Sequence, residues 1–170
     1  MKGHRGNRVL KTLTGSLVTL KRLTEKFIPD YLLMFSECVA TKLHVPSVQN
    51  EAQYVTDRLK KSNYELFFYC IFEKASNQLI GALEIRDAEE YSGQLYTWLN
   101  QQFWGGNRFQ EAMRLAVAYY FEATGQPHLR VHIDVNNGRS YRAFKKAGFA
   151  DNGIKNGPNG KQYIMVLRKK

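Results

Sequence analysis

The sequence of 170 residues has only two cysteines, Cys38 and Cys70, and no cluster of cysteines and histidines. Two cysteines are too few for a disulfide scaffold, and Cys70 lies in an aromatic run where it is expected as a small buried apolar residue. The four histidines are scattered, so no spacing indicates a metal site. A reducing cytoplasm is the simplest compartment for such a chain.

Long hydrophobic runs are also absent. No stretch approaches the roughly 18 consecutive apolar residues of a membrane helix, and the N-terminal residues are basic and polar, unlike the apolar core of a signal peptide. We therefore expect no membrane span. Hydrophobic residues make up 44% of the chain and charged residues 24%, which favours one folded domain over a disordered chain.

Acidic residues are scarce at both ends of the chain. The net charge is +10; residues 1–11 carry four basic residues and no acid, and residues 138–170 carry nine basic residues against Asp151 alone. We interpret residues 1–12 as a basic arm and residues 13–170 as the folded domain. Charge of this sign favours a polyanionic partner, either a multiply phosphorylated ligand or nucleic acid bound by the basic termini.

Apolar periodicity and turn residues divide the domain into strands and helices. The aromatic run at 64–73 is dense enough for a strand buried on both faces. The expected strands cover residues 16–22, 64–73, 79–86, 93–100, 129–135, 149–155 and 162–168, and the expected helices cover residues 24–40, 47–61, 104–124 and 139–147. This order, β-α-α-β-β-β-α-β-α-β-β, predicts one mixed α/β (α+β) domain with a central sheet of about seven strands and about four helices on its faces.

The turn between the strand at 93–100 and the longest helix contains Gly105, Gly106 and Asn107. The first N–H groups of a helix lack internal partners and carry partial positive charge, and glycines let the backbone approach a phosphate closely. Arg108 adds a positive charge near the mouth of the turn. The turn therefore indicates an anion-binding site, with a plain turn as the alternative interpretation of the local pattern.

Two longer motifs extend this pattern. Residues 137–149 read Asn-Gly-Arg-Ser-Tyr-Arg-Ala-Phe-Lys-Lys-Ala-Gly-Phe, and residues 96–112 contain the dipeptides Trp98-Leu99, Trp104-Gly105 and Glu111-Ala112. Both motifs resemble those of the GCN5-related N-acetyltransferases (the GNAT family), and they are most similar to the branch that acetylates the N-termini of ribosomal proteins. The resemblance extends from about Leu13 to Leu167.

The resemblance implies the GNAT fold and transfer of an acetyl group from acetyl-CoA, without a metal, to a primary amine on a protein N-terminus or a small molecule. In the family, the pantetheine arm of coenzyme A (CoA) pairs like an extra strand with the strand that ends here at Asn100, and a backbone N–H near Leu99 donates to the oxyanion. The positions that the resemblance assigns to the cofactor are Trp98, Leu99, Asn100, Gly105, Gly106, Asn107, Arg108, Phe109, Asn137, Arg142, Phe144 and Lys146.

Ser140 is the candidate acid that protonates the CoA sulfur. Many family members use a tyrosine for this step, but Phe144 occupies that position here and cannot donate a proton. The fourth position of the motif is often a serine in the N-terminal branch, and Ser140 occupies it. A serine that merely caps its own helix is the alternative.

Glu84 and Asp151 are the candidate general bases, with Asp87 and Asp134 as alternatives. Asn152 stands where some members of the branch have a glutamate. A dedicated base is also dispensable for an α-amine, whose pKa of about 7.7–8.0 leaves much of it neutral near pH 8.

A non-catalytic GNAT-like module that binds CoA, or binds RNA or the ribosome through its basic ends, is the competing interpretation. Three departures from the family pattern fit this interpretation: Asn107 in place of a small residue of the cofactor loop, Phe144 in place of the tyrosine and Asn152 in place of the glutamate. The acceptor amine and the oligomeric state, monomer or homodimer, stay open at this point. A basic protein repels a basic acceptor unless the acceptor groove is locally acidic. The acidic cluster of Glu84, Asp87, Glu89 and Glu90 is a candidate for such a groove, with a solvated loop as the alternative.

Overall fold

The computed structural model describes residues 11–60, 66–86 and 93–170. Expectations for residues 1–10 of the basic arm and for Asp87, Glu89 and Glu90 lie outside these ranges.

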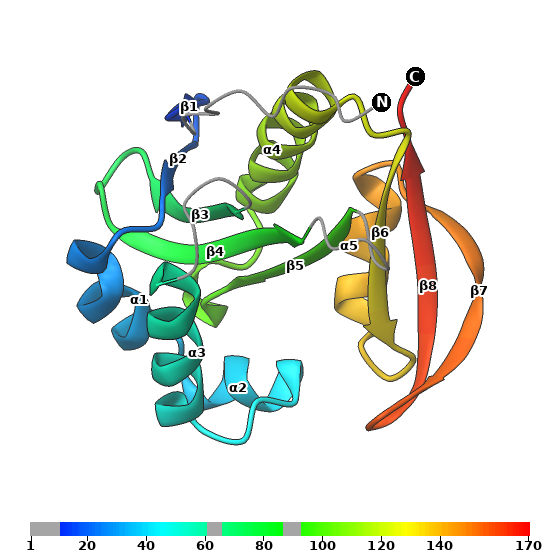
Figure 1. Ribbon diagram of the computed structural model, residues 1–170, viewed down its shortest axis with the longest axis horizontal. Helices are drawn as coiled ribbons and strands as arrows, with labels where there is room; N and C mark the ends of the chain where they lie inside the picture. Colours follow the sequence, from blue (N-terminus) through cyan, green and yellow to red (C-terminus); the bar gives the residue numbers. More distant parts are fainter. Residues whose placement is uncertain (1–10, 61–65, 87–92) are drawn as a thin grey trace.

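A single mixed sheet runs through the described structure in the order β1-β2-β3-β4-β5-β6-β8-β7 (Figure 1). Neighbouring strands are antiparallel except β5 and β6, which are parallel. Its strands are β1 (Leu13–Thr14), β2 (Val18–Arg22), β3 (Leu66–Glu73), β4 (Leu79–Arg86), β5 (Gln94–Leu99), β6 (His128–Asp134), β7 (Ala150–Gly157) and β8 (Gly160–Arg168). All seven expected strands are present, and the two-residue β1 is additional.

The described helices are α1 (Ile28–Met34), α2 (Glu37–Leu43), α3 (Val48–Lys60), α4 (Arg108–Thr124) and α5 (Gly138–Lys146), with short 3₁₀ turns at Glu25–Phe27 and Gln101–Phe103. The single helix expected over residues 24–40 is divided between α1 and α2. The reason is local: Phe35 leaves the helical region with ψ at 77°, and the Ser36 hydroxyl then caps α2 by accepting from the Val39 N–H at 3.4 Å.

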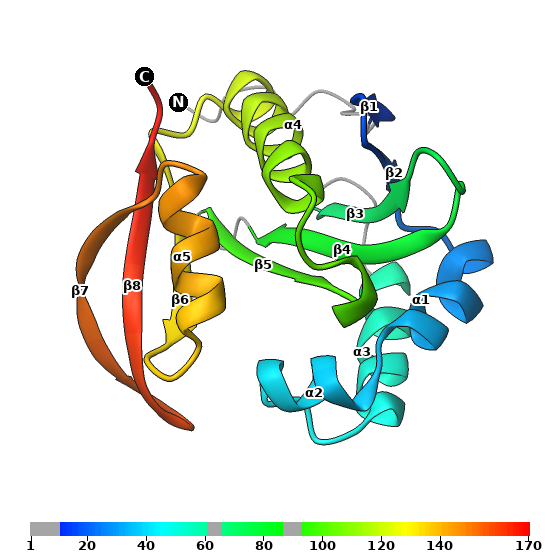
Figure 2. The ribbon, with the colours of Figure 1, turned by 180° about the vertical axis from the view of Figure 1, so that it is seen from behind.

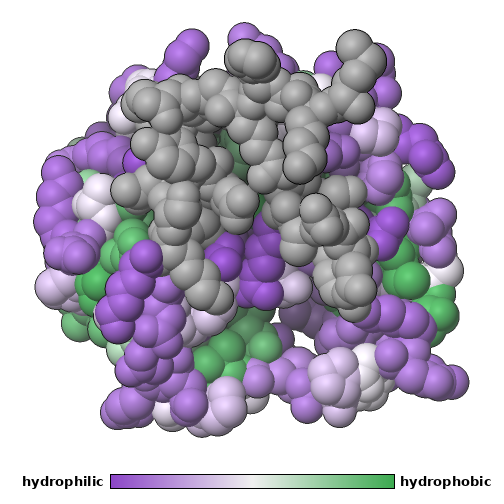
Figure 3. Space-filling model, viewed as in Figure 1, coloured by the Kyte–Doolittle hydropathy of each residue, from purple (hydrophilic) through white to green (hydrophobic). Residues whose placement is uncertain are grey.

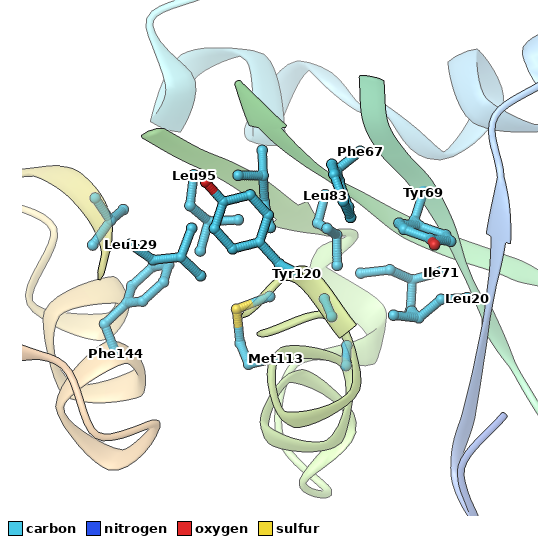
Figure 4. Close-up of a cluster of buried hydrophobic side chains, with 14 of the residues drawn as sticks. Leu20, Phe67, Tyr69, Ile71, Leu83, Leu95, Met113, Tyr120, Leu129 and Phe144 are labelled. Carbon is cyan, nitrogen blue, oxygen red and sulfur yellow. The ribbon is translucent and has the colours of Figure 1, made fainter. Parts of the chain in front are cut away.

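Helices α1, α2 and α3 cover one face of the sheet, and α4 and α5 cover the other (Figures 1 and 2). The aromatic strand β3 supplies both cores, as its composition predicted. Phe67, Tyr69 and Ile71 point toward α4, whereas Phe68, Cys70 and Phe72 point toward α1. Figure 4 shows the first of these cores, in which Tyr120 of α4 packs edge-to-face on Phe67 with ring centroids 5.2 Å apart.

Strands β5 and β6 meet at one end and then diverge. Gln94 and Arg130 form the pair that joins them within the described residues, and the Arg130 N–H donates to the Gly93 carbonyl at 2.7 Å. Beyond this pair the sheet is open between β5 and β6. That opening positions the site described below.

The carboxylate of Glu111 fastens the β1–β2 turn to α4. It accepts from the Ser16 hydroxyl at 2.7 Å and from the backbone N–H groups of Ser16, Leu17 and Val18 at 2.6 to 3.0 Å. A side chain at Gly15 would come within 2.3 Å of Glu111 Oε2, so this approach requires glycine. Partial burial acts to raise the pKa of Glu111, but the hydrogen bonds from residues 16–18 outweigh it and lower the pKa to about 2.

We predict that Glu111→Gln destabilises the protein by about 1–2 kcal/mol at neutral pH, after allowance for solvent screening. The folded-state pKa lies below the ordinary value of 4.5, so the carboxylate stabilises the fold above about pH 4.5, and that stabilisation is lost as the pH falls toward 2. Denaturant unfolding at several pH values measures this. The gap between wild type and variant should close as the pH falls; Glu122→Gln, at an exposed position of α4, is the control.

Candidate active site

The loop between β5 and α4 is held by side chains at its start. The Asn100 amide donates to the Met34 carbonyl at 2.9 Å, and its oxygen accepts from the Gln102 N–H at 3.0 Å. The Trp104 indole N–H donates to the Leu99 carbonyl at 2.9 Å. These bonds fix the position at which the chain leaves the sheet and turns toward the helix.

Three successive residues of this loop have positive φ: Gly105 at 92°, Gly106 at 61° and Asn107 at 60°. Asparagine tolerates this region better than most residues, so Asn107 is compatible with the left-handed conformation that the loop requires. These conformations delay the start of α4 to Arg108, later than the expected residue 104. Asn107 is the N-cap, but its side chain accepts none of the first N–H groups of α4, which leaves them available to an anion.

Helix α5 lies against the same loop. The Lys146 ammonium donates to the Asn107 side-chain oxygen at 3.0 Å. Phe144 joins the two helices, because its ring packs edge-to-face on Phe109 at 5.2 Å and on Phe149 at 5.1 Å. The two sequence motifs are therefore in contact in the folded protein.

The first cavity, which we call the donor cavity, has a volume of about 660 Å³ and lies between the end of β5, the loop and α5. Among the described residues that line it there is no aspartate or glutamate, and its four cationic residues are Lys42, Arg139, Arg142 and Lys146. The Arg139 guanidinium lies over the Trp104 ring, 4.4 Å from the centroid. This charge distribution suits a ligand with several phosphates.

All the residues that the resemblance assigned to the cofactor line the donor cavity except Asn100 and Arg108. Asn100 is 6% exposed and holds the loop. The Arg108 guanidinium turns away to Glu73, with Nη2 and Nε at 2.7 and 2.8 Å from the same carboxylate oxygen. The expected charge at the mouth of the turn is therefore neutralised by Glu73.

The backbone of β5 faces the donor cavity without a strand partner. The Asn100 N–H pairs back toward β4, with the Ile80 carbonyl at 2.9 Å. Alternate residues of a strand direct their backbone groups to opposite sides, so Thr97 and Leu99 point toward the opening where β6 has diverged. The Leu99 carbonyl is taken by Trp104, whereas the Leu99 N–H and the backbone of Thr97 can pair with an extended, amide-rich ligand.

The second cavity, which we call the acceptor cavity, has a volume of about 590 Å³ and lies on the α1–α3 side. The face seen in Figure 3 is hollowed between α2 and the β6–β8 strands. Both cavities share seven described lining residues: Lys42, Leu43, Thr97, Trp98, Asn137, Ser140 and Phe144. We call four of them, Thr97, Trp98, Ser140 and Phe144, the junction. The two cavities therefore lie on either side of the junction.

Ser140 is the hydroxyl-bearing residue of α5 that lines both cavities. It is not the cap of its helix: Asn137 is the N-cap, and its side-chain oxygen accepts from the Ser140 N–H at 3.2 Å. The neighbouring Tyr141 hydroxyl instead donates to Asp151 at 3.1 Å. Asp151 lines neither cavity and is paired with Lys145 at 2.9 Å; the hydrogen bond from Lys145 lowers the pKa of Asp151.

Glu84 lines the acceptor cavity and is ion-paired with two arginines, although its buried Oε1 has no hydrogen-bond partner. It is 3% exposed; Arg58 lies 2.6 Å from one carboxylate oxygen and Arg86 3.2 Å from the other. The Tyr54 hydroxyl donates to that second oxygen at 2.5 Å. The structure thus brings Ser140 and Glu84 to the cavities and leaves Asp151 on the surface.

Glu51 is a residue of the acceptor cavity that the sequence motifs missed. It is 8% exposed and accepts a hydrogen bond from Tyr31. A signal was available, because Glu51 lies four residues before Val55 and so shares the buried face of its helix. A carboxylate on an apolar helix face is unusual unless it has partners.

The family model for the acetyltransferase (GNAT) domain matches residues 18–150. The chain belongs to the GNAT acetyltransferase family. No protein of curated function matches the sequence at a significant level.

Solved structures with the same fold share little sequence with the chain. A GNAT-family acetyltransferase from Bacillus anthracis is 14% identical with a TM-score of 0.79, over 93% of this chain and 98% of that one. RimL, the ribosomal L7/L12 α-N-protein acetyltransferase solved with CoA, is 14% identical with a TM-score of 0.76, over 93% and 98%. The ribosomal-protein-S5-alanine acetyltransferase from Vibrio fischeri is 12% identical with a TM-score of 0.74, over 93% and 96%.

These likenesses establish the fold. Family membership supports acetyl-CoA as the acetyl donor, as do the four cations among the described residues of the donor cavity. Of the helices that the structure describes, none is long and apolar enough to span a membrane. Within residues 11–60, 66–86 and 93–170, no three His, Cys, Asp or Glu side chains are grouped as metal ligands.

We predict that the double variant Arg142→Ala/Lys146→Ala weakens CoA binding by about tenfold, because each cation lines the donor cavity and charged hydrogen bonds to phosphate are strong. If these residues contact the 3′-phosphate, 3′-dephospho-CoA should lose much less affinity. Calorimetric titration with both ligands measures the difference. Lys145→Ala is the control, since Lys145 pairs with Asp151 outside the cavity. An equal loss for both ligands would assign the effect to the loop that Lys146 holds.

Proposed function

We propose that this protein transfers an acetyl group from acetyl-CoA to a primary amine by direct attack of the amine on the thioester. The observation that carries the proposal is the meeting of two cavities at Thr97, Trp98, Ser140 and Phe144. One cavity has cations and uncapped helix N–H groups, and the other contains carboxylates. Direct transfer needs both substrates in place at once, with their reacting atoms adjacent.

Acetyl-CoA supplies the thioester carbonyl and the thiolate leaving group. The loop at Gly105–Asn107 and the start of α4 hold the pyrophosphate, and the open backbone of β5 pairs with the pantetheine amides. The Leu99 N–H then donates to the oxygen of the attacked carbonyl, where negative charge develops. Ser140 protonates the sulfur, directly or through one water molecule.

The acceptor that we favour is a protein or peptide N-terminus. Of the three carboxylates in the acceptor cavity, Glu84 and Asp134 are already paired with basic side chains, so Glu51 is the one left to attract a cationic amine. An α-amine is easier to deprotonate than a lysine side chain, with pKa values of about 7.7–8.0 and 10.4. Two structural relatives named above act on ribosomal proteins, which makes N-terminal peptides the first acceptors to test.

The site of action that we propose is the reducing cytoplasm, with which the free thiols of Cys38 and Cys70 are consistent.

The first experiment combines binding with turnover. Acetyl-CoA should bind in calorimetry. Its affinity should fall only in part at physiological salt, because the four cations of the donor cavity are exposed and screened whereas pairing with the β5 backbone depends little on salt. Acetylation is then measured by mass spectrometry and by release of the CoA thiol. The acceptors are a hexapeptide with a free N-terminal alanine, the same peptide with a blocked N-terminus as the control, and spermidine as a small-molecule amine. Acetyl-CoA binding without acetylation of any amine would favour the non-catalytic interpretation.

We predict that Ser140→Ala lowers kcat by at least about tenfold, toward the range typical of general acids, while leaving acetyl-CoA affinity unchanged. Steady-state kinetics and calorimetry test the two parts separately. Tyr141→Phe is the matched control, because it removes the next hydroxyl on the same helix, which bonds to Asp151 instead. Equal kcat values in the Ser140→Ala variant and the wild type would exclude Ser140 as the acid.

A further inference from the structure

Glu51 is connected to the junction by two hydrogen bonds. The Tyr31 hydroxyl donates to Glu51 Oε1 at 2.5 Å, and the Trp98 indole N–H donates to the Tyr31 oxygen at 3.2 Å. Trp98 lines both cavities. Tyr31 is 1% exposed and packs edge-to-face on Trp98 at 5.1 Å, so the position of its hydroxyl is fixed. The chain of bonds therefore holds the Glu51 carboxylate in a defined orientation beside the place where the two substrates would meet.

The other carboxylate oxygen of Glu51 remains open to the acceptor cavity. Glu51 lines this cavity, and its Oε2 makes no hydrogen bond to the described part of the chain. Oε2 is also absent from the buried polar atoms that lack a partner, so this oxygen is accessible. One oxygen is thus oriented by the protein and the other is presented to a ligand. A general base needs this arrangement, since it must be positioned and must also reach the proton.

The other acid–base groups of the cavity are less suited to take a proton. Both oxygens of Glu84 face guanidinium groups, those of Arg58 and Arg86. Burial, with the charges of Lys155 and Arg130, lowers the pKa of His132 to about 4, so its ring holds a proton too weakly to serve as a base for an amine.

On the remaining elements around the cavity, Asp134 of β6 is hydrogen-bonded to the Asn136 N–H and paired with His44 at 3.1 Å, which lowers the pKa of Asp134. From α2, Lys42 also lines the cavity, and from β7, Lys155 does so. These groups lie on the sides formed by α2, β6 and β7, whereas the hydrogen bond to Glu51 comes from Tyr31 of α1, which is itself held by Trp98 of β5.

The surroundings of Glu51 make its carboxylate more basic than that of an ordinary glutamate. Burial raises the pKa of its carboxyl above the ordinary value; the hydrogen bond from Tyr31 opposes this rise, the charge of Glu84 adds to it, and Arg86 opposes it. Burial and the adjacent carboxylate also raise the pKa of Tyr31 well above its ordinary value, so Tyr31 keeps its proton and remains a donor. A carboxylate with a raised pKa takes a proton from an ammonium group more readily than an ordinary glutamate does.

We propose that Glu51 is the general base of the reaction: it receives the ammonium group of the acceptor and takes its proton, with Tyr31 as the positioning residue. The inference rests on the proposed acetyl transfer. The ammonium loses one proton to Glu51, and the neutral nitrogen bonds to the carbonyl carbon as the carbon–sulfur bond breaks. Ser140 gives its proton to the thiolate and is reprotonated by the second proton that the nitrogen loses, directly or through water. Glu51 then releases its proton to solvent, so the net products are the amide, the CoA thiol and one proton.

The kinetic test compares Glu51→Gln with Asp57→Asn, which removes a carboxylate from the same helix outside the cavity. The probes are acetyl-CoA with the free N-terminal hexapeptide and with spermidine. For Glu51→Gln we expect a fall in kcat/KM of about a hundredfold at pH 7 that shrinks above the pKa of the amine, with acetyl-CoA affinity retained. Asp57→Asn should keep the wild-type profile.

Tyr31→Phe separates positioning from structure. Loss of its hydrogen bond removes an influence that lowers the pKa of Glu51, so the acid limb of the kcat/KM profile should move to higher pH. A purely structural role would lower the whole profile without moving that limb. A limb that stays in place in Tyr31→Phe would overturn the positioning role.

A second measurement needs no acceptor. In carbon-13 NMR of the side-chain carboxyls, the signal absent from Glu51→Gln should titrate above the roughly 4.3 of an ordinary glutamate. A midpoint at or below that value, or an unchanged kinetic profile in Glu51→Gln, overturns the inference while acetylation by the wild type keeps the proposed function intact. If the wild type binds acetyl-CoA but acetylates neither probe, the proposed function fails and the inference falls with it.

Discussion

The divergence of β5 from β6 is the constraint on which the rest of the site depends. A strand in the middle of a sheet normally pairs on both sides, because unpaired backbone groups are costly to bury. Here the pairing ends at Gln94 and Arg130, and the backbone of Thr97 and Leu99 faces an opening. The two faces of the sheet communicate through that opening, which is why the donor and acceptor cavities meet at Trp98 and Ser140.

Charge is distributed differently on the two sides of the opening. The donor cavity combines four cations with no acid among its described lining residues, while the acceptor cavity places Glu51, Glu84 and Asp134 among basic and aromatic side chains. This difference bears on the net charge of +10, because the acceptor cavity balances three carboxylates against Lys42, Arg86 and Lys155 and so repels a cationic acceptor less than the donor cavity does. Each substrate would thus be drawn to its own side of the junction.

Most strands and helices of the fold could be predicted from the sequence, because period-2 and helical apolar patterns indicate which residues are buried. The double-sided burial of β3 follows from residue type alone, and asparagine is a residue type that tolerates the left-handed conformation found at Asn107. Pairings between distant residues could not be predicted. Nothing near Arg108 in the sequence indicates that Glu73, 35 residues earlier, takes its charge.

The residues of the acceptor cavity were harder to predict from the sequence, because they too depend on contacts between distant residues. Glu51 can be recognised as a functional candidate only in the folded protein, where Tyr31 of α1 donates to it and Trp98 of β5 donates to Tyr31. Motif comparison weights positions that contact the shared cofactor, so it locates the donor cavity well. It gives little information about residues on α1 and α3, because the side chains proposed to contact the acceptor are far apart in the sequence and meet only in the folded protein.

The missing strand pair has a consequence for the lifetime of the protein. A donor whose amides complete the β5 ladder and whose phosphates rest on α4 would bind the folded chain and not the unfolded one. Such a ligand adds about 2.7 kcal/mol of stability at a hundred times its dissociation constant. Resistance to unfolding and to proteolysis would then follow the supply of acetyl-CoA, so the abundance of the protein would itself report the metabolic state of the cell.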